Sequence, residues 1–188
     1  MHLLVHVCCG PCASYPVPYL LKKGHKLHGF FYNPNIHPYQ EYSRRMEAAK
    51  QMAAAFNIEM IWASEYELEK YLREVSFRED KRCRYCYYLR LQRAAQVAKH
   101  GHFDAFTTSL LVSPYQKHDL IREIGELAAK EVGVPFYYED FRPGYAESVA
   151  RSRELGLYRQ PYCGCIFSER DRYAPRNKKA KENTSGNK

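Results

Sequence analysis

The residues best suited to chemistry in this chain of 188 residues are its seven cysteines. They fall into three groups, namely Cys8, Cys9 and Cys12, then Cys83 and Cys86, and then Cys163 and Cys165. The odd count and the lack of a recognisable signal peptide disfavour the disulfide framework of a secreted protein. Because the spacing within each group lets neighbouring thiolates converge on one centre, the pattern predicts metal binding or redox chemistry.

The first group stands in the stretch VHVCCGPCA, directly after a short apolar run. We expect Cys8 and Cys9 to end a strand, with a tight turn at Gly10 and Pro11. Cys12 would then open a helix, whose dipole favours a thiolate. Small buried cysteines can also simply pack in a core. A doublet with a third cysteine so near favours a loop of ligands over that alternative.

The second group, CRYC, opens a predicted helix, so Cys83 and Cys86 share one helix face. Alone, this motif fits a zinc site, a thioredoxin-type pair or half of an iron–sulfur site. Together with the cysteine doublet it supplies four thiolates, enough for a cluster or a structural zinc. Seven cysteines exceed one tetrahedral zinc site, and adjacent cysteines are unusual zinc ligands, so iron–sulfur is favoured.

The third group, YCGC, places one glycine between Cys163 and Cys165. Such a pair can close a small, strained disulfide that is reduced easily, which favours a redox-active role over a structural one. The alternative is that one or both thiolates bind metal.

The elements that must position these groups alternate between strand and helix. Apolar runs predict short strands at residues 2–7, 26–32, 58–62, 103–107 and 135–138. Helical spacing predicts helices at residues 13–23, 39–56, 65–75, 85–99 and 116–132. This order predicts an α/β fold with a mostly parallel sheet and helices on both faces. Ligands of such sheets bind beyond the carboxyl ends of the strands, where the first cysteine group lies.

The length predicts one α/β catalytic domain over residues 1–173. Basic residues exceed acidic ones by 8, and half of that excess lies in residues 174–188, which are typical of a disordered basic tail. That tail either keeps the chain in solution or contacts phosphates. No apolar run reaches the ~18 residues that a membrane span needs, so we expect a cytoplasmic protein without a membrane partner.

A basic run with no acidic residue accompanies the second cysteine group, and it comprises Lys81, Arg82, Arg84, Arg90 and Arg93. Three tyrosines interleave with it, namely Tyr85, Tyr87 and Tyr88. Arginines that hold a backbone and aromatic rings that stack on unpaired bases are typical of single-stranded RNA binding. An amphipathic helix must also bury part of this stripe, and we expect Tyr88 with Leu89 or Leu91 to pack in the core.

Five separated strings carry a resemblance to known proteins: HVCCGPCA, RCRYCYYLRL, FTTSLLVSPYQ, DFRPGY and LYRQPYCGCIFS. In order and at full spacing, from about residue 2 to residue 170, they resemble the QueH-type epoxyqueuosine reductases. The resemblance implies an oxidoreductase that reduces epoxyqueuosine to queuosine at the wobble position of tRNA anticodons. It implies that this last step of queuosine biosynthesis proceeds here without cobalamin. It also implies a 4Fe-4S cluster and a sheet related to the adenine-nucleotide hydrolase and PP-loop folds.

By the same resemblance, the cluster is bound by Cys8, Cys9, Cys83 and Cys86. Cys163 and Cys165 match a redox-active pair that closes a disulfide bond. Cys12 matches the family string as well, and a further metal ion, iron, is the role considered for it. The partners implied are tRNA carrying epoxyqueuosine, held by Arg82, Arg84, Arg90 and Arg93, and an electron donor that the sequence does not identify.

The reaction itself sets what the site needs. Removing an epoxide oxygen as water takes two electrons and two protons, and thiolate-held iron can deliver electrons and bind oxygen. A proton donor is also required. The candidates are Asp140, Tyr115 and Tyr145, because the motifs DFRPGY and SPYQ follow strand-like segments.

Two other functions account for part of the pattern. A sulfur-transferring tRNA enzyme of the PP-loop type would need a loop rich in glycine and serine for pyrophosphate, but the first turn is CCGPCA. A non-enzymatic zinc-binding RNA module would use the basic helix and four cysteines, and it leaves the other three unexplained.

Overall fold

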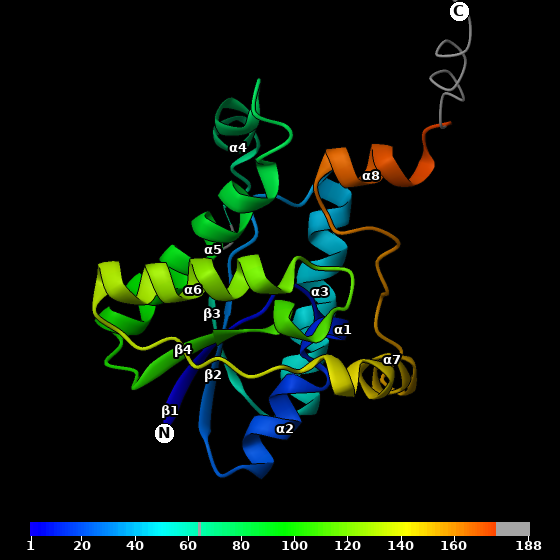
Figure 1. Ribbon diagram of the computed structural model, residues 1–188. Coiled ribbons are helices and arrows are strands. Elements are labelled where there is room, and N and C mark those ends of the chain that lie inside the picture. The colour runs from blue at the N-terminus through cyan, green and yellow to red at the C-terminus, as the bar shows by residue number, and fades with distance from the viewer. Residues whose placement is uncertain (64, 176–188) are drawn as a thin grey trace, which may run out of the picture.

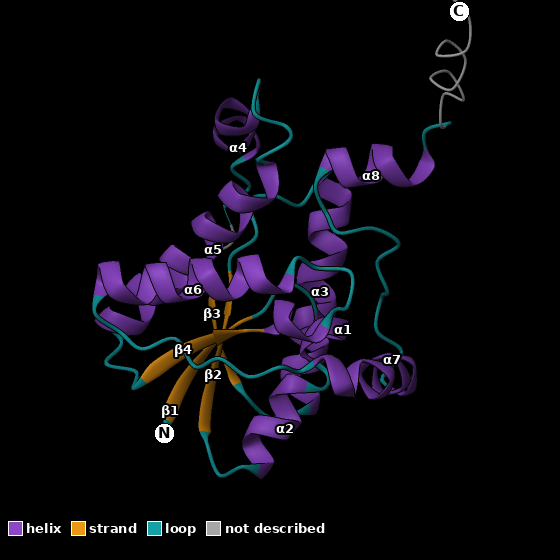
Figure 2. Ribbon diagram, viewed as in Figure 1, coloured by secondary structure: helices purple, strands orange, loops and turns teal. Residues whose placement is uncertain are grey.

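The computed structural model describes residues 1–63 and 65–175, and at its centre lies a sheet of four parallel strands (Figures 1 and 2). The strands are β1 (His2–His6), β2 (Lys26–Phe31), β3 (Glu59–Trp62) and β4 (Ala105–Thr108). Their order across the sheet is β3-β2-β1-β4. Leu3 pairs with Leu27 on one side and with Ala105 on the other. The carboxyl ends of β1, β2 and β4 therefore meet at one edge of the sheet.

Both faces of the sheet are covered by helices. Leu3, Leu4 and Val5 of β1 point alternately to opposite faces, and all three are fully buried. Helix α5 (Arg82–His100) packs on β1 and β4, whereas α2 (Pro16–Lys22) and α3 (Tyr39–Ala55) pack on β2. Figure 2 shows α5 and α6 (His118–Val132) on one side of the strands and α2 and α3 on the other. The predicted α/β class with a parallel sheet is confirmed.

The remaining elements are short. They are α1 (Gly10–Ala13), α4 (Leu68–Val75), α7 (Tyr145–Glu154) and α8 (Ile166–Tyr173), with two 3-10 turns, η1 (Ser109–Val112) and η2 (Arg142–Gly144). Helix α1 fills the gap between the end of β1 and the middle of α3, and it also contacts α7 and η1. It therefore brings the loop after β1 into contact with three other parts of the chain.

The structure differs from the sequence expectation in three respects. The helix predicted at residues 13–23 is divided, because Pro16 lacks a backbone N–H and fits only the first turn of α2. The strand predicted at residues 135–138 amounts to one isolated bridge between Phe106 and Phe136. Helices α7 and α8 were not predicted. None of the α8 side chains is buried, so this helix carries no apolar periodicity to detect.

In the described part of the chain, no helix is both long and apolar enough to cross a membrane. The division into a domain at residues 1–173 and a basic tail at residues 174–188 stays a prediction, since residues 176–188 lie outside the described residues.

Candidate active site

The thiols of the first cysteine group lie together at the carboxyl end of β1. The Sγ atoms of Cys8, Cys9 and Cys12 are all within 4.8 Å of one another, and those of Cys8 and Cys9 are 3.8 Å apart. Cys8 and Cys9 are buried and Cys12 is partly buried. The structure therefore groups Cys12 with the doublet as an equal member of one three-thiol cluster.

The local backbone explains this clustering. Cys9 has an extended backbone and caps α1, in which Pro11 occupies the first turn. Gly10 lies so close to α3 that a Cβ atom there would be 2.2 Å from the carbonyl oxygen of Ala48. Only glycine permits this approach, which presses the loop after β1 against α3 and keeps its thiols inside the protein.

Charge in this cluster is concentrated on Cys8. Hydrogen bonds from the thiols of Cys12 and Cys9 hold the pKa of the Cys8 thiol well below its usual range. Ser109, which directly follows β4, adds a hydrogen bond from Oγ to the Sγ of Cys8 at 3.4 Å and accepts one from the Cys8 backbone N–H at 3.1 Å. Burial raises the pKa of the Cys9 thiol. The cluster therefore favours one thiolate that is stabilised by neighbouring donors.

The second and third cysteine groups lie near each other at the start of α5. Cys86 packs with Cys165, Tyr71 and Val75 in a small buried apolar cluster. Burial raises the pKa of the Cys86 thiol to about 12, and negative charge on Cys163, Cys165 and Cys83 raises it further. Each of these thiols is close enough to act on the others, so two distant segments of the sequence supply one thiol-rich region.

The segment that carries the third group is anchored to α3 by a buried arginine. Arg45 is 2% exposed and donates from Nη1 to the carbonyl of Cys163 and from Nη2 to that of Tyr162, both at 2.9 Å. Its Nε donates to Oε1 of Glu41 at 2.7 Å. Cys165 then caps α8, its Sγ accepting from the N–H of Ser168 at 3.4 Å. All seven cysteines are free thiols in the described part of the chain.

Two glutamine amides face the thiols. Gln160 donates from Nε2 to the Sγ of Cys9 at 3.0 Å and to that of Cys12 at 3.5 Å. Gln116 donates from Nε2 to the Sγ of Cys163 at 3.2 Å, and its other amide atom accepts from the Tyr87 hydroxyl at 2.7 Å. Both glutamines belong to strings that carry the family resemblance, FTTSLLVSPYQ and LYRQPYCGCIFS. A single glutamine forms no spaced motif, so its role could not be predicted from the sequence.

Arg90 is placed differently from the sequence expectation. Its side chain is 2% exposed, with Nη2 donating to the Sγ of Cys86 and Nε to the Cys86 carbonyl, each at 3.0 Å. Negative charge on Cys163 and Cys8 also acts on this guanidinium, so it stands between the cysteine groups. A buried guanidinium does not reach an RNA phosphate. The expected tRNA contact of Arg90 is therefore replaced by a contact with a cysteine.

The other three arginines of the basic run remain accessible. Arg82 donates to Asp171 of α8 at 2.7 Å, and Arg84 pairs with Glu123 of α6 at 2.8 Å. Arg93 is exposed and lines a polar cavity of about 630 Å³ beyond the carboxyl ends of β2 and β3, together with Tyr32 and Trp62. The tyrosine of this helix that packs in the core is Tyr87, which is 3% exposed, whereas the expected Tyr88 is only partly buried. The expected packing of Leu91 is confirmed, because this side chain is fully buried.

The three candidate proton donors differ in charge and in exposure. Hydrogen bonds from Arg142 lower the pKa of the Asp140 carboxyl to about 2, so this group is ionised at neutral pH and does not fit the expected role of an acid. Tyr115 is 82% exposed. Tyr145 is partly buried, with its ring 5.9 Å from that of Tyr115. Burial raises the pKa of Tyr145, and negative charge on Tyr115 and Cys12 adds to the effect.

Comparison with known proteins shows the family of this chain. The model of the family described as "Epoxyqueuosine reductase QueH" matches residues 3–171. A protein of that name from Dehalococcoides mccartyi is 41% identical over 179 residues, covering 95% of this chain and 98% of its own. One from Thermotoga maritima is 38% identical, covering 88% of this chain and 89% of its own. One from Streptococcus pyogenes is 34% identical, covering 88% and 69%. The chain therefore belongs to the epoxyqueuosine reductase QueH family of oxidoreductases.

Proposed function

We propose that this chain reduces epoxyqueuosine to queuosine at the wobble position of tRNA anticodons, as the last step of queuosine biosynthesis and without cobalamin. One observation carries the proposal. The thiols of Cys8, Cys9 and Cys12 lie within 4.8 Å of one another at the end of β1, and the buried Arg90 donates to the Sγ of Cys86 at the start of α5, in a chain of this family.

The reaction requires two electrons and two protons, because the epoxide oxygen leaves as water while the two ring carbons form a double bond. The chain's own residues have to hold the substrate oxygen, exclude bulk water and provide a proton. Four of the cysteines, Cys8, Cys9, Cys86 and Cys165, are buried, and electrostatic interactions are strong in such a setting.

The donor set fits an iron–sulfur cluster. The Sγ atoms of Cys8, Cys9 and Cys12 lie within 4.8 Å of one another, which supports a metal site in the loop after β1, and neighbouring hydrogen bonds hold the pKa of the Cys8 thiol well below its usual range. Cys8, Cys9, Cys83 and Cys86 would hold a 4Fe-4S cluster, with Cys12 left for a further iron. When bound, this group supplies one-electron transfer at low potential and a Lewis acid for oxygen.

Several side chains prepare the same region for charge and proton transfer. Arg90 provides a buried positive charge beside Cys86 that stabilises negative charge there. The Oε1 atom of Gln160 is buried without a hydrogen-bond partner among the described residues, so it is free to accept a hydrogen bond from the substrate. Tyr145 is protonated at neutral pH and partly buried, and it is our choice for the proton donor because Asp140 is ionised and Tyr115 is exposed.

Cys163 and Cys165 are proposed as the two-electron store. Oxidation of this dithiol to a disulfide releases two electrons and two protons, which balances reduction of the epoxide and loss of water. A separate electron donor must then reduce the disulfide again. The anchoring of this segment by Arg45 supports the role, because it fixes the pair beside Cys86.

The substrate is held as tRNA. Arg82, Arg84 and Arg93 are the arginines of α5 that reach the surface, and we propose that they contact the phosphates of the anticodon arm.

The test is an anaerobic assay with protein reconstituted with iron and sulfide, tRNA that carries epoxyqueuosine, and a strong reductant. We expect queuosine, measured by mass spectrometry of nucleosides, and broad absorbance near ~400 nm. The zinc-loaded protein is the matched control and should be colourless and inactive. A verified cluster with no queuosine formed would refute the proposal, and stoichiometric zinc without iron would favour a zinc-binding RNA module.

A further inference from the structure

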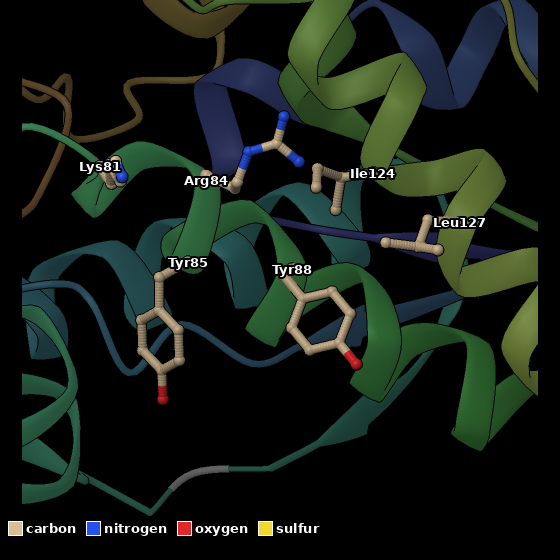
Figure 3. Close-up of a pocket in the computed structure, with 6 residues that line it drawn as sticks. All are labelled: Lys81, Arg84, Tyr85, Tyr88, Ile124 and Leu127. Carbon is tan, nitrogen blue, oxygen red and sulfur yellow. The ribbon is translucent and has the colours of Figure 1, made fainter.

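A pocket of about 260 Å³ lies between α5 and α6, on the side of α5 that faces away from the cysteines. It is lined by Lys81, Arg84, Tyr85, Tyr88, Ile124 and Leu127. Figure 3 shows Arg84, Tyr85 and Tyr88 on α5, Lys81 just before this helix, and Ile124 and Leu127 on α6. At 100° per residue, Tyr85 and Tyr88 lie roughly opposite Cys83 and Cys86 on the helix.

The floor of this pocket is apolar and its rim is basic. Ile124 is buried, but Leu127 is 40% exposed, an unusual position for a large apolar side chain beside two partly buried tyrosines. Lys81 is exposed and makes no ion pair with any residue that the structure describes. A flat apolar surface next to free positive charge is the pattern that binds an unpaired base and its phosphate.

The acidic neighbours do not cancel this charge. Arg84 pairs with Glu123, but the two side chains are 51% and 56% exposed, so the pair is weak and can exchange for a phosphate. The Tyr88 hydroxyl donates to Glu131 at 3.0 Å, and the Gln92 amide donates to that hydroxyl at 2.6 Å. These hydrogen bonds hold the hydroxyl end of Tyr88 in place, so the ring has a defined position for stacking.

We propose that this pocket binds one unpaired nucleotide of the RNA substrate, a neighbour of the nucleotide whose base is reduced. The base stacks on Tyr88 against Leu127, and its phosphate is contacted by Lys81 and Arg84. The proposal rests on the proposed function, since it takes tRNA as the substrate. The first two turns of α5 carry Cys83 and Cys86 on one side and the pocket on the other, so a single strand that crosses the start of α5 can reach both.

Binding is tested with the reconstituted protein and a fluorescent anticodon stem-loop RNA, by anisotropy. Tyr88→Ala should raise the Kd of this RNA roughly 5- to 100-fold, the usual effect of losing one base stack. Tyr88→Phe keeps the ring but loses the hydroxyl bonds to Glu131 and Gln92, and it should bind more tightly than Tyr88→Ala and close to the parent. Lys81→Ala should raise the Kd of the RNA and reduce the salt dependence of that Kd by about one charge. Lys99 is an exposed lysine at the far end of α5, so Lys99→Ala should change neither quantity.

A second variant guards against misfolding. Leu127→Asp alters an exposed position, so it should fold with unchanged iron content while weakening RNA binding. Photo-crosslinking with 5-iodouridine placed at each loop position in turn should join one position to Tyr88 or Tyr85, identified by mass spectrometry of peptides.

The two proposals fail in different ways. Parent-like RNA affinity in Tyr88→Ala, Lys81→Ala and Leu127→Asp would overturn the nucleotide pocket and leave the reductase function intact. Unchanged RNA affinity with a raised KM for a protein electron donor would assign the pocket to that donor and also overturn the proposal. Pocket-dependent RNA binding without any reduction of epoxyqueuosine would support the pocket and refute the reductase function.

Discussion

Arg90 donates a hydrogen bond from Nη2 to the Sγ of Cys86 at 3.0 Å, inside the protein. Both residues lie on α5 and are separated by one helical turn, so the backbone of the helix fixes their relation. Arg90 belongs to a basic run that the sequence placed at the surface, but in the structure it is a buried positive charge beside a cysteine.

Arg90→Met is expected to lower turnover about tenfold or more, because a hydrogen bond to a charged group contributes ~1.5–3 kcal/mol. Its KM for tRNA and the salt dependence of that KM should stay unchanged, since the guanidinium reaches no phosphate. Arg93→Ala, at an exposed position of the same helix, is the matched control and should raise the KM and weaken the salt dependence. A weakened salt dependence in Arg90→Met would contradict this assignment. Thermal melting checks that both variants fold.

The ligand assignment is tested by single serine substitutions. Serine at Cys8, Cys9, Cys83 or Cys86 should lower the iron content after reconstitution and abolish turnover, because each removes one thiolate ligand. Iron analysis and absorbance spectra measure the effect. If Cys83→Ser and Cys86→Ser both keep the full cluster absorbance, the second cysteine group does not bind the cluster. The three-thiol cluster would then be the only supported metal site in the described residues.

The redox role of the third group predicts a different result. Replacing Cys163 and Cys165 together by serine should leave the cluster absorbance nearly intact while turnover falls to background, because the electron store is lost. Thiol titration of the parent protein before and after one turnover should show the loss of two free thiols. Iron lost in proportion to activity would show instead that these cysteines are ligands.

Buried histidines predict a loss of stability in mild acid. Burial lowers the pKa of His37 to about 4 in the folded protein, below the ordinary value near 6.5. Between these values the unfolded chain binds the extra proton, so the free energy of unfolding falls as the pH falls. For His37 the loss is about 2 kcal/mol between pH 7 and pH 5.

His37→Phe keeps a ring against Tyr66 and Tyr71, so urea unfolding at the two pH values should show a smaller difference than in the parent. His6, whose pKa burial also lowers to about 4, keeps part of the pH dependence in that variant. His100→Gln changes an exposed histidine and is the control. An undiminished pH difference in His37→Phe would contradict the assignment.

Much of the site could be predicted where the signal is local. The strand, turn and short helix around Cys8, Cys9 and Cys12 follow from a few adjacent residues, and Cys83 and Cys86 share a helix face because of their spacing. The parallel sheet follows from the alternation of strand and helix.

The rest depends on contacts between distant segments. The sequence of α5 shows which residues share a face, but which face turns inward is decided by packing on β1 and β4, so Arg90 and Arg93 could not be told apart. The low pKa of Asp140 arises from Arg142, two residues away in the motif DFRPGY. The Nε and Nη2 atoms of Arg142 both donate to the carboxylate, and the turn that allows this contact has no clear sequence signal. The contact of Gln160 with Cys9 joins residues 151 positions apart.

The anchoring of the last cysteine segment by Arg45 has a consequence for how the protein is made. Arg45 and Cys163 are separated by 118 residues, so their contact closes a very long loop and depends on nearly the whole chain. Cys8 and Cys9 leave the ribosome long before the segment that carries Cys163 and Cys165. A metal supplied to the nascent chain would meet the thiols of one loop without their later partners. We therefore expect the site of the proposed cluster to be complete only after synthesis, once the segment that carries Cys163 and Cys165 is anchored by Arg45.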